Sequence, residues 1–134
     1  MKIARACEEE GVKIPAPFSR TIKVLFSPDK QGVEELMFTY AILDPNGKTD
    51  YHKHDRPELI IIVEGEGKCI TEAQTCDIFP DTAIWSEAEE YHQIVNTGAD
   101  GLKLATVFVP GFPAEDNYRR CLDAANAIRK DGAN

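Results

Sequence analysis

The chain has 134 residues, with 15 Lys and Arg against 23 Asp and Glu, and a formal net charge of −8 at pH 7. This length suits one hydrophobic core, so we expect residues 1–134 to form a single domain. The acidic balance argues against nucleic acid as a partner, because phosphates attract basic surfaces. No apolar run approaches the ~20 residues that cross a bilayer, and no N-terminal stretch resembles a secretory signal. We therefore expect a cytoplasmic protein with no membrane partner.

Short β-prone runs, punctuated by turn residues, fill most of the chain. The first expected strand covers 21–26, and the second covers 36–43 and ends at Asp44-Pro45-Asn46-Gly47. Further strands are expected at 51–53, 59–63, 68–71, 75–79, 82–85, 93–95 and 102–109. Many short strands at nearly even spacing predict an antiparallel sandwich or barrel with its core at about 19–110. Residues 1–18 suit either an arm or a short helix.

The C-terminal part of the chain shows a helical pattern instead. Between about 115 and 130, apolar side chains recur at helical intervals, at Tyr118, Cys121, Leu122, Ala125 and Ile128. We expect one amphipathic helix that packs on the outside of the barrel. The predicted fold class is therefore all-β with one C-terminal helix.

The cysteines lie at positions 7, 69, 76 and 121, and no two of them form a Cys-x-x-Cys pair. Reduced thiols are the expected state for a cytoplasmic protein. A second interpretation stays open for one pair. If Glu72-Ala73 is a two-residue turn, Cys69 and Cys76 lie directly opposite across two strands and a cross-strand disulfide would fit there.

All three histidines of the chain fall into one pattern. His52 and His54 are two residues apart, Glu58 follows His54 by four residues, and His92 is the third histidine. On a β-strand, residues i and i+2 point to the same face, so His52 and His54 can aim at one point. Imidazole and carboxylate together suit a divalent transition metal, namely Fe, Mn, Ni, Cu or Zn. The pattern predicts a metal site.

These residues resemble the two sequence motifs of the cupin superfamily. The first motif is matched by Gly47, His52, His54, Glu58 and Gly65, with the leading glycine one residue closer than in the commonest spacing. The second motif ends in a histidine followed four residues later by an asparagine, and His92 and Asn96 match it. The resemblance covers roughly residues 36–110.

The second motif departs from the family pattern before its histidine. Families usually carry glycine, proline and glycine at positions that here hold Asp81, Glu87 and Glu89. This difference leaves the loop conformation at the pocket mouth open. Asn96 also has two interpretations: it either braces His92 or serves as a turn residue before Thr97-Gly98.

The resemblance implies a double-stranded β-helix, or jelly roll, with a metal inside the barrel. His52, His54, Glu58 and His92 would be the protein ligands, leaving two octahedral positions open. Strand alternation predicts further inward side chains at Ile60, Ile62 and Ile94, and at either Phe38, Tyr40 and Ile42 or Met37, Thr39 and Ala41. Tyr40 is the polar pocket residue that we favour among these.

Two classes of function fit this site. One is a metal-dependent enzyme that acts on a small oxygen-bearing substrate, as a dioxygenase, decarboxylase, lyase or isomerase. Because the three histidines are committed to metal, the catalytic base would be Glu58, a tyrosine such as Tyr40, or metal-bound hydroxide. The alternative is a non-catalytic cupin that binds or senses a small ligand, or whose metal only tightens the barrel. The resemblance further implies a homodimer, with residues 18–26 supplying the paired edge strand.

Overall fold

The structure is a computed structural model that describes residues 1–132, excluding the side chains of residues 129, 131 and 132. A short 3-10 helix, Ala6–Glu8, precedes the strands. The strands are β1 (Val12–Ile14), β2 (Arg20–Phe26), β3 (Met37–Leu43), β4 (Glu58–Glu64), β5 (Gly67–Thr71), β6 (Thr75–Ile78), β7 (Ala83–Ser86), β8 (His92–Asn96) and β9 (Leu102–Phe108). Helix α1 (Ala114–Gly132) follows them.

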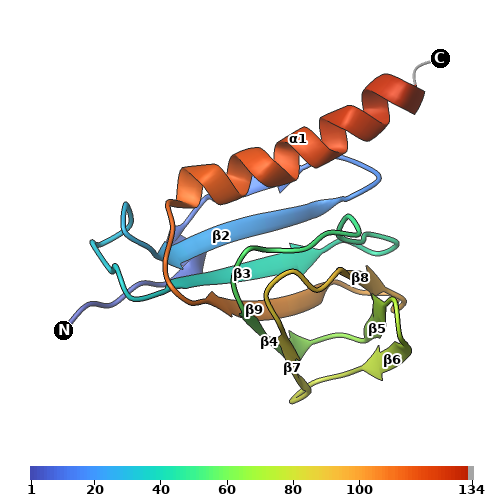
Figure 1. The fold of residues 1–134 in the computed structure, drawn as a ribbon, viewed down its shortest axis with the longest axis horizontal. Helices are drawn as coiled ribbons and strands as arrows, with labels where there is room; N and C mark the ends of the chain where they lie inside the picture. Colours follow the sequence, from blue (N-terminus) through green and yellow to red (C-terminus); the bar gives the residue numbers. More distant parts are fainter. Residues whose placement is uncertain (133–134) are drawn as a thin grey trace.

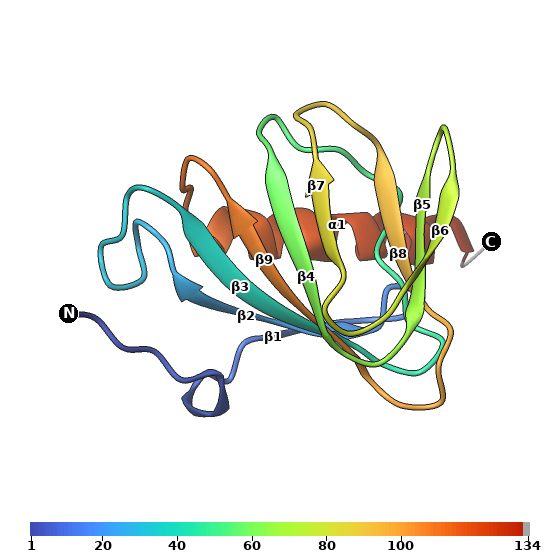
Figure 2. The ribbon, with the colours of Figure 1, turned by 90° about the horizontal axis from the view of Figure 1, so that it is seen from below.

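The strands form two antiparallel sheets that face each other. The larger sheet has the order β1-β2-β3-β9-β4-β7, and the smaller has the order β6-β5-β8 (Figure 2). The segment from Gly47 to His52 runs beside β8, where it makes the isolated bridges Lys48↔Val95 and His52↔His92. This arrangement is a double-stranded β-helix with one C-terminal helix, so the predicted fold class is confirmed.

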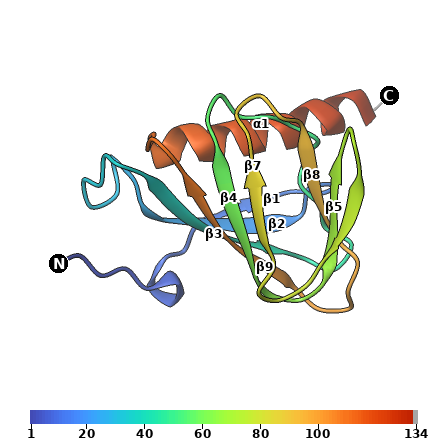
Figure 3. The same ribbon diagram turned by 60° about the horizontal axis from the view of Figure 1, so that its bottom comes forward.

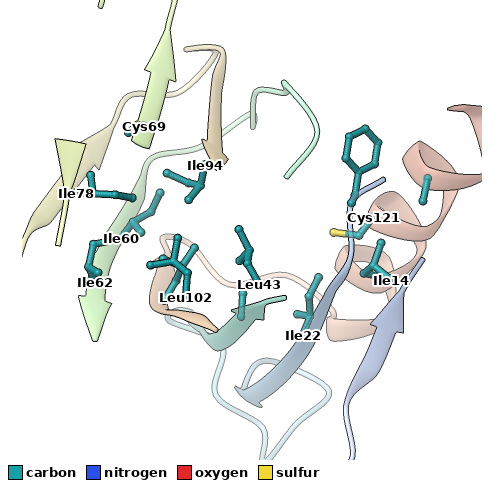
Figure 4. Packing of buried hydrophobic residues seen from close by; sticks show 14 residues of the cluster. Ile14, Ile22, Leu43, Ile60, Ile62, Cys69, Ile78, Ile94, Leu102 and Cys121 are labelled. Atoms are coloured by element: carbon teal, nitrogen blue, oxygen red, sulfur yellow. The ribbon is translucent and has the colours of Figure 1, made fainter. Parts of the chain in front are cut away.

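Side chains from both sheets meet in the core between them (Figure 4). Ile60, Ile62 and Ile94 are all buried there, as their alternation predicted. On β3 the buried set is Met37, Thr39 and Ala41, whereas Phe38, Tyr40 and Ile42 alternate to the other face.

The placement of Tyr40 in the pocket is therefore wrong. Its ring lies 5.5 Å from the ring of Phe38 and under the ammonium group of Lys103, on the outer face of the sheet. Both faces of β3 carry apolar side chains, so alternation alone could not distinguish the inward set from the outward one. The inward hydroxyl on this strand belongs to Thr39.

Three expectations about strands need correction. Residues 51–53 form no strand beyond the bridge at His52, and the short strand β1 was not predicted. Strand β2 is paired on both sides, by β1 and β3, so residues 18–26 do not provide an exposed edge for a dimer. The edges of this sheet are β1 and β7. The homodimer itself stays a prediction.

Helix α1 closes one side of the barrel instead of packing on its outside. It runs along the β2 side of the molecule (Figures 1 and 3), and its Cys121 and Ala125 belong to the core cluster. Asn117 and Arg120, on the same side of the helix, line the cavity inside the barrel. The predicted apolar stripe of the helix did not include Asn117 and Arg120, because both side chains are polar. It did include Ile128, which is 47% exposed.

No helix within residues 1–132 is long and apolar enough to span a membrane.

The hairpin between β5 and β6 places Cys69 directly opposite Cys76, as the two-residue turn predicted. Both residues are free thiols in the structure. Cys69 is buried, and burial raises the pKa of its thiol to about 11. A high pKa keeps the sulfur protonated and weakly nucleophilic at neutral pH.

The loops before β8 keep the backbone shape that glycine favours. Asp81 has φ of 70° and Glu89 has φ of 66°, and these are two of the positions at which the family pattern has glycine. The departure in sequence therefore leaves a left-handed backbone in place at both residues. Such a backbone costs a residue with a Cβ roughly 1 kcal/mol or more.

Asn96 holds the turns at the end of the barrel together. Its buried side-chain amide donates to the carbonyl oxygens of Leu43, Asp44 and Asp100, at 3.1, 3.1 and 2.8 Å. Its side-chain oxygen accepts from the backbone N–H of Gly98 at 2.9 Å. These contacts support the turn interpretation, and none of them involves His92.

We predict that Asn96→Ala lowers the free energy of unfolding by about 2–4 kcal/mol, because the buried carbonyl of Leu43 and the partly buried carbonyls of Asp44 and Asp100 lose a donor. Urea denaturation measures this change. Thr97→Ala, at an exposed neighbouring position, is the control and should change stability little. A loss of less than about 0.5 kcal/mol in Asn96→Ala would contradict the role of this side chain.

A second prediction concerns the left-handed backbone at Glu89. Glu89→Gly should be more stable than Glu89→Ala by about 1 kcal/mol, because only glycine adopts this φ without strain. Both variants lose the exposed ion pair with Lys53, so their difference isolates the backbone. Equal stabilities in thermal or urea denaturation would show that the strain is absent.

Candidate metal centre

Four side chains predicted from the sequence meet inside the barrel: His52, His54, Glu58 and His92, here called the His/Glu cluster. Glu58 and His92 are the first residues of β4 and β8, and both are buried. His52 is fixed beside β8 by two backbone hydrogen bonds with His92, at 3.0 and 2.8 Å. His52 and His54 therefore do not lie on one strand, as their spacing predicted. Instead, the backbone bridge between His52 and His92 brings the two motifs together.

The ligand atoms of the His/Glu cluster all lie within 4.8 Å of one another. Nε2 of His52 is 3.0 Å from Nε2 of His54, and Nε2 of His92 is 3.0 Å from Oε1 of Glu58. Adjacent ligands at right angles around a metal with bonds of about 2.1 Å lie about 3 Å apart. Oε1 of Glu58 is also buried and accepts no hydrogen bond from a described residue. The residues present therefore fit a divalent cation.

Hydrogen bonds orient two of the imidazoles for this role. Nδ1 of His52 lies 2.7 Å from the carbonyl oxygen of Asp50, and Nδ1 of His92 lies 3.1 Å from that of Glu90. Because a carbonyl oxygen only accepts, we assign the ring proton to Nδ1 in both residues. The lone pair then stands on Nε2, the atom that faces the other members of the cluster.

Burial also sets the protonation state of the imidazoles. It lowers the pKa of His52 to about 4, helped by the positive charge of Arg120, and it lowers the pKa of His54 to about 4. Burial acts in the same direction on His92, but the negative charge of the Glu58 carboxylate, 3.0 Å from its Nε2, outweighs it, so that the pKa of His92 is raised. His52 and His54 are therefore neutral at pH 7, as metal ligation requires.

A cavity of about 50 Å³ adjoins the His/Glu cluster. Its walls are mainly apolar, with polar groups from Arg20, Thr39, Thr106, Asn117 and Arg120. The hydroxyl oxygens of Thr39 and Thr106 lie 3.3 Å apart. An outer depression of about 310 Å³ shares His54, Asn117 and Arg120 with this cavity. This outer depression lies between residues 53–56 and the start of α1.

Sequence reasoning missed the charged group beside the cluster. Nη1 of Arg120 donates to the carboxylate of Asp50 at 3.0 Å, and Nη2 of Arg20 lies 3.7 Å from the same carboxylate. The one sequence feature that could have indicated this group is the position of Asp50, two residues before His52. Nothing in the sequence brought Arg20 and Arg120 to the same site, because that requires the position of α1.

We predict that the metal-free protein loses stability as the pH falls from about 6.5 to about 4. His52 and His54 have native pKa values of about 4, so the unfolded chain binds more protons than the native state in this interval. The expected loss is on the order of a few kcal/mol. Urea denaturation across this pH range measures it. His54→Gln should reduce the slope, and an unchanged slope would show that His54 does not titrate as described.

Comparisons with known proteins agree with this architecture. A protein of known structure, a predicted oxalate decarboxylase from Thermotoga maritima, has 22% identity and a TM-score of 0.71, covering 81% of this chain and 99% of that one. The polyketide cyclase RemF from Streptomyces resistomycificus has 23% identity and a TM-score of 0.71, covering 88% and 90%. Ectoine synthase from P. lautus has 14% identity and a TM-score of 0.74, covering 90% and 86%. At these identities the likeness shows the fold alone.

No curated protein sequence matches the chain. The model of the cupin domain family does match it, over residues 39–108, which is more than half of its length. That range contains the whole His/Glu cluster. The chain belongs to the cupin family.

Proposed function

We propose that this cupin binds a divalent transition metal through the His/Glu cluster and acts as an enzyme on a small oxygen-bearing organic molecule. The observation that carries the proposal is the convergence of three imidazoles and one carboxylate, at ligand spacing, beside a cavity. Four protein ligands leave open coordination positions, which separates a catalytic metal site from a closed structural one. The donor set suits Fe, Mn, Ni, Cu or Zn.

A bound metal would supply a Lewis acid that polarises an oxygen atom of the substrate. The protein itself supplies the shape and polarity around that atom. The apolar walls, formed by residues such as Ile60, Ile94 and Phe108, restrict water, and the hydroxyls of Thr39 and Thr106 offer hydrogen bonds. Glu58 is the one carboxylate that lines the cavity among the described residues, so it is the group that would accept a proton there.

The fold does not select the reaction, because cupin barrels host many chemistries. The three similar proteins of known structure carry names of three different activities, a decarboxylase, a cyclase and a synthase. The reaction class of this chain is therefore to be found by assay.

We predict that protein purified anaerobically without added metal contains close to one transition-metal ion per chain. His92→Ala and Glu58→Gln should lower metal affinity by at least about 10-fold, because each removes a ligand. Elemental analysis and metal titration measure both quantities. Glu87→Gln removes an exposed carboxylate near the site and should leave metal binding unchanged.

An empty wild-type site that also refuses added Fe, Mn, Ni, Cu and Zn would overturn the metal proposal. The enzymatic part is tested on the metal-loaded protein with small acids and diketones as substrates. Turnover that disappears on chelation and in Glu58→Gln supports it. Tight metal binding with no turnover of any member of that set would instead favour a binding or sensing cupin.

A further inference from the structure

Two arginines face one carboxylate beside the His/Glu cluster. The carboxylate of Asp50 accepts from Nη1 of Arg120 at 3.0 Å and lies 3.7 Å from Nη2 of Arg20. Arg20 is only 2% exposed, and its Nη1 donates to the carbonyl of Phe18 at 2.9 Å. A single negative charge thus stands between two positive charges inside the barrel, and one positive charge has no carboxylate of its own.

Three other basic side chains around the outer depression each face a carboxylate. These pairs are Lys53 with Glu89 at 2.8 Å, Arg56 with Asp55 at 2.7 Å, and Arg119 with Asp116 at 3.7 Å. Glu58, within the cavity, faces His92 and His54. With Glu58 bound to a cation, the remaining positive charge inside the barrel belongs to the group formed by Arg20, Asp50 and Arg120.

Arg120 is one of three described residues that line both hollows of this region. It lines both the inner cavity of about 50 Å³ and the outer depression of about 310 Å³. Its Nε is buried and donates to no acceptor among the described residues. A buried donor without an acceptor is costly, so an oxygen atom of a ligand would stabilise this arrangement. Nη1 of Arg120 donates to Asp50 and Nη2 donates to Sγ of Cys121 at 3.3 Å, so Nε is the donor left for a ligand. A carboxylate oxygen is the acceptor that gains most from the positive charge of this donor.

We propose that the ligand of this site is a small carboxylate, held by Arg120 at the junction of the two depressions, with a second oxygen group toward the His/Glu cluster. This inference rests on the proposed function, because it names the substrate class of the same site. Arg20 and Arg120 both lie outside residues 39–108. The recognition element is thus contributed by β2 and α1, beyond the part of the chain that the family model matches.

The test is calorimetric binding of malonate, a small dicarboxylate, to the protein loaded with Zn²⁺ and to the metal-free protein. The neutral analogue malonamide and inorganic phosphate are titrated in parallel. The variants are Arg120→Gln, which removes the charge, and Arg120→Lys, which keeps the charge without the planar fork. Arg119→Gln is the matched control, since Arg119 is the exposed neighbour that pairs with Glu115 on the helix surface.

We expect malonate to bind wild type roughly 10- to 100-fold more tightly than it binds Arg120→Gln, which corresponds to one charge-assisted interaction. Arg120→Lys should fall between the two, and Arg119→Gln should match wild type. Metal affinity should remain unchanged in Arg119→Gln, and it is measured in both Arg120 variants so that a change at the metal site is separated from a change in malonate binding. The preference for malonate over malonamide in the metal-free protein needs no variant and involves no chelation by zinc, so it tests the proposal even if Arg120→Gln folds poorly.

Three results would overturn the carboxylate proposal. They are equal binding of malonate and malonamide, tighter binding of phosphate than of malonate, and a loss of metal affinity in Arg120→Gln that fully accounts for weaker malonate binding. The last result would mean that Arg120 only positions His52 through Asp50. If wild type takes up no metal but binds malonate in an Arg120-dependent manner, the proposed metal function fails and the carboxylate site stands.

Discussion

The carboxylate of Asp50 is the contact on which the site depends, because it joins three separate parts of the chain. It accepts from Arg120 on α1, lies 3.7 Å from Arg20 on β2, and belongs to the residue whose backbone carbonyl fixes the ring of His52. Removing one member of such a buried group leaves an uncompensated charge, which is strongly destabilising. The orientation of His52 is thereby tied to the docking of the C-terminal helix.

Burial prepares the His/Glu cluster for a cation. It lowers the pKa of His52 and His54 to about 4, so neither imidazole carries a competing proton at neutral pH. The same burial leaves Oε1 of Glu58 without a hydrogen bond. A cation would satisfy that oxygen and the converging lone pairs together, whereas the metal-free arrangement carries the cost of close acceptor atoms. These unfavourable features of the cluster therefore favour metal binding.

The sequence alone predicted the features that depend on local spacing. It did not predict the contacts between segments that lie far apart in the chain. The ligand residues and the strands that carry Glu58 and His92 follow from the motif and from alternation. Alternation could not orient β3, because both of its faces are largely apolar, and Tyr40 was assigned inward although Thr39 is the buried residue. The role of Arg120 was missed because a polar residue in an amphipathic helix usually faces solvent. Its burial depends on α1 closing the barrel.

The proposed metal ligands and the two arginines come from different parts of the chain. All members of the His/Glu cluster lie within residues 39–108, the part that the family model matches, whereas Arg20 and Arg120 come from either side of it. The chain carries a net charge of −8, yet the cavity gathers two arginines around one shared aspartate. Local charge, not net charge, decides which ligand enters a buried site. The acidic exterior would repel small anions at long range, whereas the two arginines would retain those that reach them, so selection occurs inside the barrel.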